Sequence, residues 1–574
     1  MRKLLTYLKE YKKETIFGPL FKLLEASFEL LVPLVIASMI DKGITAGDRT
    51  YVLKMCGVLV ALCFIGFITA LTAQYFAAKA AAGFARKVKR ALFANIQSLS
   101  FSDMDRVGTS AMITRMTSDI NQVQQGVNLT IRLVLRSPFV VFGAMIMAFT
   151  IDFRQAMIFV VTIIMLFAVV AAIMAFNIPG YGRIQKGLDK LLGLTRENHT
   201  GVRVIRAFGL ENKEKEEFHK SNNELMKLQE FVGGVSALMN PVTFVILNLA
   251  IAYLIYKSAF LVNNGELTRG QVVALYNYMS QILIELIKLA NLVITITKAI
   301  ASGDRVQELL ELKSSMQDGD DETFENTDIQ IEFKDACMRY AGDSEDSLEH
   351  VSFDVKRGEK IGVIGGTGSG KSTLINLIPR FYDVREGTVL IDGKDVKNYK
   401  LEALREKIGI VPQKAVLFHG TIRDNMRWGN AGATDEEIYE ALKIAQAEEI
   451  VRGKENGLDH MVSQGGKNFS GGQKQRLTIA RALVKKPEIL ILDDSASALD
   501  FLTDKNLRHA IADMENAPTT FIVSQRTSSV HDCDKIIVLD NGAVAGIGTH
   551  DELLSCCELY KEIYDSQYKQ EGAV

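Results

Sequence analysis

Cysteines are few in this chain, and they do not form the patterns that metal sites or disulfide frameworks need. None of the six lies in a C-x-x-C pair, and two fall in the first, strongly apolar third of the sequence. Zinc sites and small secreted domains both depend on characteristic cysteine spacings, so we expect reduced structural thiols. The six are Cys56, Cys63, Cys337, Cys533, Cys556 and Cys557.

A strong net charge is also missing. The formal charge is −2 at pH 7, which gives no indication of a nucleic-acid-binding surface. The sequence has no low-complexity tract and no internal repeat. Its start, MRKLLTYLKEYKKET, is basic and amphipathic, and no small-residue cleavage site follows the first apolar run. We therefore expect that run to be a retained helix rather than a signal peptide.

Apolar residues are abundant and unevenly distributed. They make up 48% of the 574 residues, and the mean hydropathy is +0.11. The long apolar runs fill the first 300 residues, and charge concentrates after them. A bilayer-spanning helix needs about 20 mostly apolar residues. Six runs meet this requirement, at roughly 15–40, 52–78, 129–150, 155–178, 237–263 and 271–298.

Lysine and arginine residues between these runs predict their orientation. The N-terminal segment and the stretches 79–127 and 179–236 are rich in both, whereas the remaining loops are short and nearly uncharged. Cytoplasmic loops carry the positive excess, so we expect a multi-pass protein of the cytoplasmic membrane with both termini in the cytoplasm. The two long charged stretches predict helices that continue about 30 Å or more into the cytoplasm, at about 1.5 Å per residue.

The organisation of the chain follows from these patterns. Residues 1–310 form the predicted membrane domain, and the acidic, aliphatic-poor stretch 311–327 is the predicted linker. Residues 328–574 alternate short β-branched runs with amphipathic helical stretches. Strands that alternate with helices predict an α/β domain with a largely parallel sheet.

A phosphate-binding loop lies in this second domain. GGTGSGKST follows a predicted strand and opens a helix, as the motif G-x-x-x-x-G-K-[ST] requires. Lys371 is expected to meet the β- and γ-phosphates, and the Ser372 hydroxyl to bind Mg²⁺; Asp493, at the end of the buried strand ILILD, is expected to hold the Mg²⁺ shell. The loop comprises Gly365, Gly366, Thr367, Gly368, Ser369, Gly370, Lys371, Ser372 and Thr373.

A second phosphate-binding element lies between these two motifs. In NFSGGQKQRLTIARAL, Ser470, Gly471 and Gly472 open an amphipathic helix, and hydroxyl and backbone N–H groups at a helix start can bind phosphate. One chain cannot easily fold both elements around one nucleotide. The sequence therefore suggests a sandwich of two chains.

With these motifs in this order, the chain resembles the ATP-binding cassette (ABC) exporters over nearly its whole length. The resemblance implies ATP and Mg²⁺ as cofactors, and an all-α six-helix transmembrane domain fused to a C-terminal α/β P-loop nucleotide-binding domain. Ser470 to Gln473 resembles the signature that touches the γ-phosphate held by the opposite cassette. Gln413 resembles the glutamine that senses Mg²⁺, and Tyr340 resembles the aromatic residue that stacks on adenine.

The resemblance extends to the membrane half. The stretches 199–218 and 108–124 resemble the two cytoplasmic loops that carry coupling helices, and Asp41 matches a common position at the outer end of the first span. Solvated helices are the alternative for both stretches, but a match in two separate loops favours coupling.

Two residues depart from the family pattern at the γ-phosphate. Asp494 stands where the family has the glutamate that polarises the attacking water, and Gln525 stands where it usually has histidine. A carboxylate one methylene shorter is held back by more than about 1 Å, which can cost ~100-fold in rate. Glutamine cannot become positively charged near pH 7. The combination resembles the degenerate half of a heterodimeric exporter, whose intact signature completes the site of a second half-transporter chain; a homodimer with two slow sites is the alternative.

The substrate is not specified by the sequence. Small hydrophobic or amphipathic compounds of the multidrug type are the expectation from the resemblance, with lipids or peptides as alternatives, and contact with membrane lipid follows from the spans. A soluble ATPase and an ATP-gated channel are the rival functions. Four ionisable residues at or near membrane depth are candidates for the substrate cavity or its entrance: Glu25, Glu29, Glu285 and Lys288. The alternative is that Glu25 and Glu29 are hydrated near the cytoplasmic end of the first span, and that Glu285 and Lys288, three residues apart, pair with each other.

Overall fold

The computed structural model describes residues 3–495 and 497–568, and these residues divide into two compact units. One unit contains residues 1–97 and 110–312, and the other contains residues 98–109 and 313–574.

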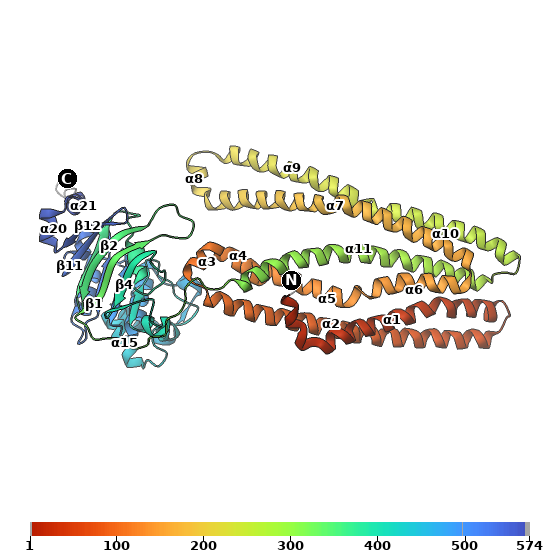
Figure 1. Ribbon diagram of the computed structural model, residues 1–574, viewed down its shortest axis with the longest axis horizontal. Coiled ribbons are helices and arrows are strands. Elements are labelled where there is room, and N and C mark those ends of the chain that lie inside the picture. The colour runs from red at the N-terminus through yellow and green to blue at the C-terminus, as the bar shows by residue number, and fades with distance from the viewer. Residues whose placement is uncertain (1–2, 496, 569–574) are drawn as a thin grey trace. The chain divides into compact units, whose positions relative to one another are not determined.

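The first unit is all-helical, as predicted (Figure 1). Within the described residues, six helical spans are long and apolar enough to cross a membrane: Leu4–Ile44, Arg49–Ser98, Thr109–Ile151, Phe153–Thr200, Glu211–Asn263 and Arg269–Glu311. All six predicted runs fall inside them. The α-helices are α1 (Lys12–Ser38), α2 (Arg49–Ser98), α4 (Thr109–Thr114), α5 (Ile120–Leu133), α6 (Arg136–Ile151), α7 (Phe153–Thr200), α8 (Val202–Ala207), α9 (Glu211–Ala237), α10 (Met239–Asn263) and α11 (Arg269–Glu311).

Short irregular turns complete these spans. A 3-10 helix, η1 (Leu4–Tyr11), precedes α1, and π-helical turns η2 (Met39–Ile44) and η3 (Arg115–Asp119) follow α1 and α4. Helix α11 is the most enclosed span, since it packs against α1, α5, α6, α7 and α10. Apolar side chains on the outer faces of the bundle stay exposed, including Phe64, Phe67 and Phe167. Such faces suit lipid, because hydrocarbon solvates them as well as a protein core does.

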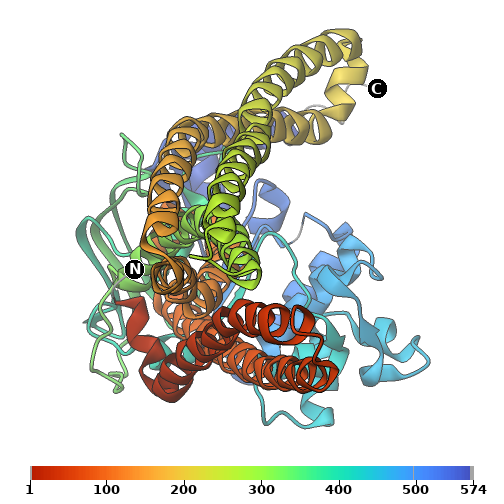
Figure 2. The same ribbon diagram turned by 90° about the vertical axis from the view of Figure 1, so that its right-hand side faces the viewer.

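A long helical hairpin extends from this bundle. Helices α7 and α9 run side by side and are joined at the tip by the short helix α8 (Figure 1 and Figure 2). Most side chains in the second half of α7 and in α8 are exposed. At the tip, Val202, Val204, Phe208 and Leu210 are between 40% and 75% exposed, so the tip presents an apolar surface.

The second unit is an α/β domain with a mainly parallel sheet, which confirms the predicted fold class. Its six-stranded sheet has the order β12-β11-β3-β10-β9-β6, and every neighbouring pair is parallel except β11–β12. An antiparallel sheet of order β2-β1-β4-β5 and the short pair β7–β8 complete the strands of the described chain. The strands are β1 (Ile329–Met338), β2 (Leu348–Lys356), β3 (Lys360–Gly365), β4 (Glu386–Ile391), β5 (Lys394–Asp395), β6 (Ile408–Val411), β7 (Gly420–Thr421), β8 (Met461–Val462), β9 (Ile489–Asp493), β10 (Thr519–Val523), β11 (Lys535–Asp540) and β12 (Ala543–Gly548).

The central strands are buried on both faces. Ile489, Leu490 and Ile491 of β9 are fully buried, and alternate residues contribute to two separate hydrophobic clusters. Strands covered on both sides are close to continuous apolar runs, which explains the run ILIL in β9 and the run FIV that follows two buried threonines in β10. The helices are α3 (Phe101–Val107), α12 (Lys371–Leu377), α13 (Leu401–Glu406), α14 (Ile422–Arg427), α15 (Asp435–Ile444), α16 (Glu448–Arg452), α17 (Gly471–Val484), α18 (Phe501–Ala512), α19 (Thr527–Val530), α20 (His550–Cys556) and α21 (Glu558–Tyr568), with 3-10 turns η4 (Gly457–Asp459) and η5 (Gln464–Gly466).

Candidate functional site

The Gly-rich loop joins β3 to α12 in a backbone shape that needs glycine. Gly368 and Gly370 have φ values of +83° and +95°, which L side chains rarely adopt. A Cβ on Gly365 would lie 2.2 Å from the carbonyl oxygen of Leu539 on the neighbouring strand. The loop therefore stays close to the sheet and leaves its outer side open for a phosphate chain.

Lys371 lies at the start of α12 and turns back over the loop. Its Nζ donates to the carbonyl oxygens of Gly365 (2.9 Å) and Gly366 (2.5 Å). Burial lowers the pKa of this ammonium, and the nearby carboxylates of Asp494 and Asp493 oppose that shift. The side chain is thus a partly desolvated cation beside the phosphate loop.

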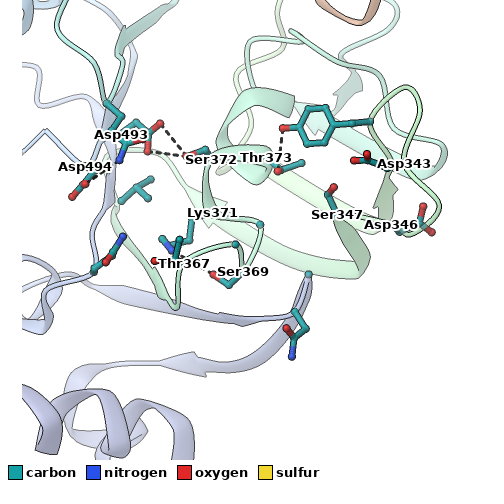
Figure 3. Close-up of a pocket in the computed structure, with 18 of the residues that line it drawn as sticks. Asp343, Asp346, Ser347, Thr367, Ser369, Lys371, Ser372, Thr373, Asp493 and Asp494 are labelled. Carbon is teal, nitrogen blue, oxygen red and sulfur yellow. Dashed lines mark hydrogen bonds between the residues drawn. The ribbon is translucent and has the colours of Figure 1, made fainter. Parts of the chain in front are cut away.

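Ser372 and Asp493 face each other across the cavity (Figure 3). The serine Oγ is 3.2 Å and 3.1 Å from the two carboxylate oxygens of Asp493. Burial raises the pKa of Asp493, and the negative charge of Asp494 adds to that effect. Mg²⁺ prefers oxygen ligands and is usually bound through one or two carboxylates together with substrate phosphates. A hydroxyl and a carboxylate in this arrangement fit that ion.

Strand pairing brings the two departures from the family pattern to the same end of the cavity. Asp493 at the end of β9 pairs with Val523 at the end of β10. Asp494 follows with φ +46°, and its N–H donates to the Val523 carbonyl at 2.9 Å. Gln413, two residues past the end of β6, donates from Nε2 to the Asp494 carboxylate at 3.3 Å. Gln525, two residues past β10, lines the same cavity.

The cavity has a volume of about 650 Å³, within the range of small-molecule sites. It brings together most of the predicted nucleotide-binding residues: Tyr340, Thr367, Gly368, Ser369, Gly370, Lys371, Ser372, Thr373, Gln413, Asp493, Asp494 and Gln525. Gly365 and Gly366 lie beneath Lys371 and do not line it.

Tyr340 occupies the end of the cavity away from the two carboxylates. Its hydroxyl is 3.1 Å from Thr373 Oγ1, and its ring meets that of Tyr382 edge-on at 5.0 Å. Several other lining residues could not be predicted, because they belong to loops without a motif. They are Asp343, Ser344, Glu345, Asp346, Ser347, Asn541 and Gly542.

The second phosphate-binding element is not part of this cavity. Ser470 is the N-cap of α17, where its Oγ accepts from the N–H of Gln473 at 3.3 Å and its own N–H donates to Gln473 Oε1 at 3.0 Å. This capping box keeps the Ser470 and Gln473 side chains on their own helix. Ser470, Gly471, Gly472 and Gln473 are absent from the lining of the cavity, as expected for an element that serves a different nucleotide.

The unit that holds the cassette also contains α3, which comes just before the predicted coupling stretch 108–124 in the chain. Residues 98–109 belong to the same compact unit as the cassette, whereas most of 108–124 lies in the helical unit. The Phe101 ring lies 4.8 Å from that of Phe381, and Tyr382 donates its hydroxyl proton to Asp105 at 2.7 Å. Asp103 accepts from the N–H of Ser315 at 2.8 Å, which fixes the start of α3.

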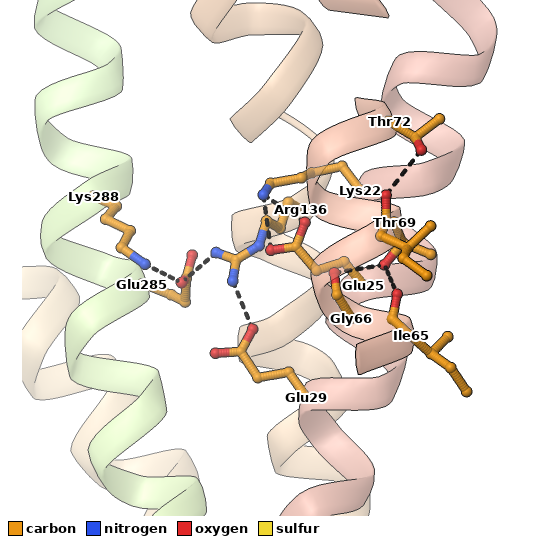
Figure 4. A network of polar contacts seen from close by, with 11 residues as sticks. Lys22, Glu25, Glu29, Ile65, Gly66, Thr69, Thr72, Arg136, Glu285 and Lys288 are labelled. Carbon is orange, nitrogen blue, oxygen red and sulfur yellow. Dashed lines mark hydrogen bonds and ion pairs between the residues drawn. The ribbon is translucent and has the colours of Figure 1, made fainter. Parts of the chain in front are cut away.

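An ionic network centred on the buried side chains of Arg136 and Glu285 joins three of the spans (Figure 4). Arg136 of α6 donates to Glu285 of α11 and to Glu29 of α1, both at 2.6 Å. Glu285 also accepts from Ser137 at 2.9 Å and from Lys288 at 2.8 Å. The predicted pair between Glu285 and Lys288 is confirmed. The sequence did not predict Arg136, because its partners are 149 and 107 residues away.

The other membrane acid, Glu25, pairs within α1. Lys22 donates to both of its carboxylate oxygens, at 2.8 Å and 2.5 Å. Since Glu25, Glu29 and Glu285 all have basic partners, these carboxylates neutralise protein charges in this structure. In η2, the turn that follows α1, Asp41 accepts from Thr268 Oγ1 at 2.5 Å and from the Gly270 N–H at 2.8 Å, so it caps α11.

Comparisons with known proteins agree with this architecture. Residues 15–286 match the ABC transporter transmembrane region family, and residues 348–497 match the ABC transporter family. An uncharacterized ABC transporter ATP-binding protein of Bacillus subtilis, YfiB, is 35% identical to this chain over 573 residues. The match covers 100% of both chains. The chain belongs to the ABC transporters, with the exporter arrangement of a transmembrane domain fused to an ATPase domain, and it carries out ATP-driven export.

Further relatives differ in what their names assign to them. YgaD of B. subtilis, named as a candidate multidrug export ATP-binding/permease protein, is 33% identical over 99% of this chain and 98% of its own length. The ATP-dependent lipid A-core flippase of Vibrio parahaemolyticus is 26% identical over 99% and 97%. The structure of a bacterial Atm1-family ABC exporter with ATP bound has a TM-score of 0.80 at 23% identity, and covers 97% of this chain and 98% of its own, which shows the fold.

Proposed function

We propose that this chain is one half of a heterodimeric exporter of hydrophobic or amphipathic compounds, and that its own Walker site hydrolyses ATP slowly. The observation that carries the proposal is the composition of the phosphate end of the cavity. Asp494 and Gln525 line it beside an intact set of phosphate and metal ligands, Lys371, Ser372 and Asp493. Binding chemistry is retained, and the groups that activate water are weakened.

Asp494 is a poor general base for two reasons. Its side chain is one methylene shorter than glutamate, and its backbone is fixed by the hydrogen bond to Val523. Its Oδ2 also accepts a hydrogen bond from Gln413 Nε2 at 3.3 Å, which ties the carboxylate to that side chain. A base must come within about 2.6–3.2 Å of the proton that it abstracts, so a retracted carboxylate polarises water weakly.

The remaining residues bind and orient the nucleotide. Lys371 exchanges its bonds to loop carbonyls for phosphate oxygens, and Tyr340 lies where an adenine ring can stack. Ser372 and Asp493 would hold Mg²⁺, which neutralises charge on the β- and γ-phosphates when it is bound. Gln525 donates a neutral hydrogen bond to the γ-phosphate. ATP held in this way dissociates or reacts slowly, so the two cassettes stay partly engaged between turnovers.

Two features support a second chain as the partner. Ser470 to Gln473 keep an intact signature outside the lining of this chain's own cavity, where it is available to a nucleotide on another cassette. The apolar tip at α8 is exposed within the described chain, and contiguous exposed apolar surface marks an interaction site. In the proposed cycle, ATP draws two cassettes together, and the coupling helices transmit that movement to the membrane spans.

The substrate class is supported by the relatives and by the membrane domain. YgaD is named for multidrug export and the Vibrio protein for lipid A-core flipping, and both are amphipathic cargo classes. Glu25, Glu29 and Glu285 each pair with a basic side chain, so these three acids do not favour a cationic cargo. The orientation with both termini in the cytoplasm is supported by the distribution of lysine and arginine. A lipid exporter is the second candidate.

Co-purification from the native membrane tests the heterodimer. A tag on this chain should recover, in equal amount, a second ABC chain that has glutamate at the position of Asp494 and histidine at the position of Gln525. Recovery of this chain alone would overturn the heterodimer and leave a homodimer with two slow sites. Reconstituted vesicles separate export from an ATP-gated channel, because only a channel gives ion conductance when ATP is added.

A further inference from the structure

The loop that carries Gln525 is held by its backbone. It begins after β10, where Ser524 donates its N–H to the Val363 carbonyl at 3.1 Å. It ends at α19, and within it the Arg526 N–H donates to Ser524 Oγ at 3.0 Å. The Gln525 side chain is exposed to the cavity that it lines, so its direction depends on how firmly the backbone of residues 524–527 is fixed.

Gln567, from the C-terminal helix α21, bridges this loop. Its Nε2 donates to the Gln525 carbonyl at 2.7 Å. Its Oε1 accepts from both the N–H and the Oγ1 of Thr527, each at 2.9 Å. One amide group therefore makes three hydrogen bonds to the two residues that flank Arg526. Thr527 is buried at this contact.

The helix that presents Gln567 is itself firmly seated. Tyr560 is fully buried, and its hydroxyl is 2.8 Å from Nδ1 of His550. Ile563 packs against the hydrophobic cluster of the cassette to which Tyr560 belongs. Residues 560, 563, 564 and 567 follow the spacing i, i+3, i+4, i+7, which places them on one face of a helix. The buried tyrosine thus anchors the face from which Gln567 reaches the loop, two turns further along.

We propose that Gln567 is a positioning residue for γ-phosphate recognition. It fixes the backbone on both sides of Arg526 and so holds the Gln525 side chain at the phosphate end of the cavity. This inference rests on the proposed function, in which Gln525 contacts the γ-phosphate. ADP has no γ-phosphate. The contact between α21 and the loop of residues 524–527 therefore favours ATP over ADP and leaves ADP binding unaffected.

The test measures ATP and ADP binding separately at this chain. The exporter is purified through a tag on this chain with whatever co-purifies, photolabelled on ice with radioactive 8-azido-ATP, and competed with ATP or ADP before the chains are resolved on a gel. Gln567→Ala should weaken ATP binding about three- to tenfold, because it loosens the hydrogen bond from Gln525 to the charged γ-phosphate. Hydrogen bonds to charged groups are among the stronger ones. ADP binding should stay within about twofold of the wild type.

Two further variants sharpen the test. Gln567→Glu keeps the acceptor for both Thr527 donors and loses the donor to the Gln525 carbonyl, so its loss of ATP affinity should be intermediate. Ser566→Ala is the matched control, because among the described residues the Ser566 hydroxyl donates to the Ile563 carbonyl of its own helix, at 2.8 Å; it should leave both affinities unchanged. If Gln567→Ala cannot be recovered intact, the glutamate variant decides: a selective loss of ATP affinity supports the inference, and no selective loss overturns it.

The outcomes separate this inference from the function on which it rests. Equal weakening of ATP and ADP in Gln567→Ala, with a lower melting temperature, would mean a purely structural helix and overturn the inference. A silent Gln567→Ala beside a Gln525→Ala that selectively loses ATP would overturn the inference alone. A silent Gln525→Ala would remove the γ-phosphate contact from the proposed function, and the role of Gln567 with it.

Discussion

Lengthening the carboxylate at residue 494 should restore hydrolysis at this chain's Walker site. Asp494 lies directly after β9, and its backbone is fixed by the bond to Val523 at 2.9 Å. An added methylene therefore moves the carboxylate forward instead of shifting the chain. The gain in reach is more than about 1 Å, given a C–C bond of about 1.5 Å.

The expected magnitude follows from that distance. A misplacement of about 1 Å can cost ~100-fold in rate, which corresponds to about 2.7 kcal/mol in the barrier. Asp494→Glu should raise kcat at this site by at least tenfold and at most ~100-fold, with KM changed less than about threefold. The upper limit requires Gln525→His as well, because in the proposed function Gln525 makes only a neutral contact to the γ-phosphate.

The assay is loss of the γ-phosphate from ATP bound to this chain. The assembled exporter is loaded with 8-azido-ATP labelled at the α- or the γ-position, chased with unlabelled ATP, and crosslinked at successive times. A fall in the ratio of γ- to α-label on this chain reports hydrolysis at its own site. Asp513→Glu is the matched control, because Asp513 is exposed beyond the end of α18. If Asp494→Glu, alone and with Gln525→His, leaves that rate unchanged, the retracted carboxylate is not what limits the site.

Four further variants test other parts of the structure. Burial raises the pKa of Asp493 above its unfolded value, so the charged carboxylate opposes folding at every pH above that raised pKa. Asp493→Asn should therefore stabilise the nucleotide-free protein by about 0.5–2 kcal/mol and abolish the extra rise in melting temperature that Mg²⁺ adds to ATP; a lower melting temperature would contradict this. Arg136→Met breaks the buried pair with Glu285 and should lower the free energy of unfolding by about 3–5 kcal/mol, seen as a lower melting temperature in detergent. The double variant Arg136→Met with Glu285→Leu should melt closer to the wild type. A double variant as unstable as the single one would argue against the pairing. Tyr382→Phe removes the hydroxyl that bonds Asp105 and keeps the ring, so we expect about two- to threefold more ATP hydrolysed per substrate exported in vesicles, and an unchanged ratio would exclude this contact from coupling.

Sequence patterns with a local cause predicted most of the fold. A run of about 20 apolar residues is enough to specify a span, and all six predicted runs lie within helices of the structure. Strands buried on both faces are mostly apolar or β-branched, so β9 (ILILD) and β10 (TTFIV) were recognisable. The phosphate loop was predictable because its backbone requires glycine where Gly368 and Gly370 have positive φ.

The tertiary structure decided the contacts between residues that are distant in the chain. Arg136 pairs with Glu285 and Glu29, and Gln567 donates to the carbonyl of Gln525, 42 residues earlier. These contacts form because packed helices and strands bring distant parts of the chain together. Nothing in the local sequence around Gln567 distinguishes it from an ordinary exposed glutamine. A side chain of common type acquires such a role only from its neighbours in the fold, and these are set by packing over the whole unit rather than by local periodicity.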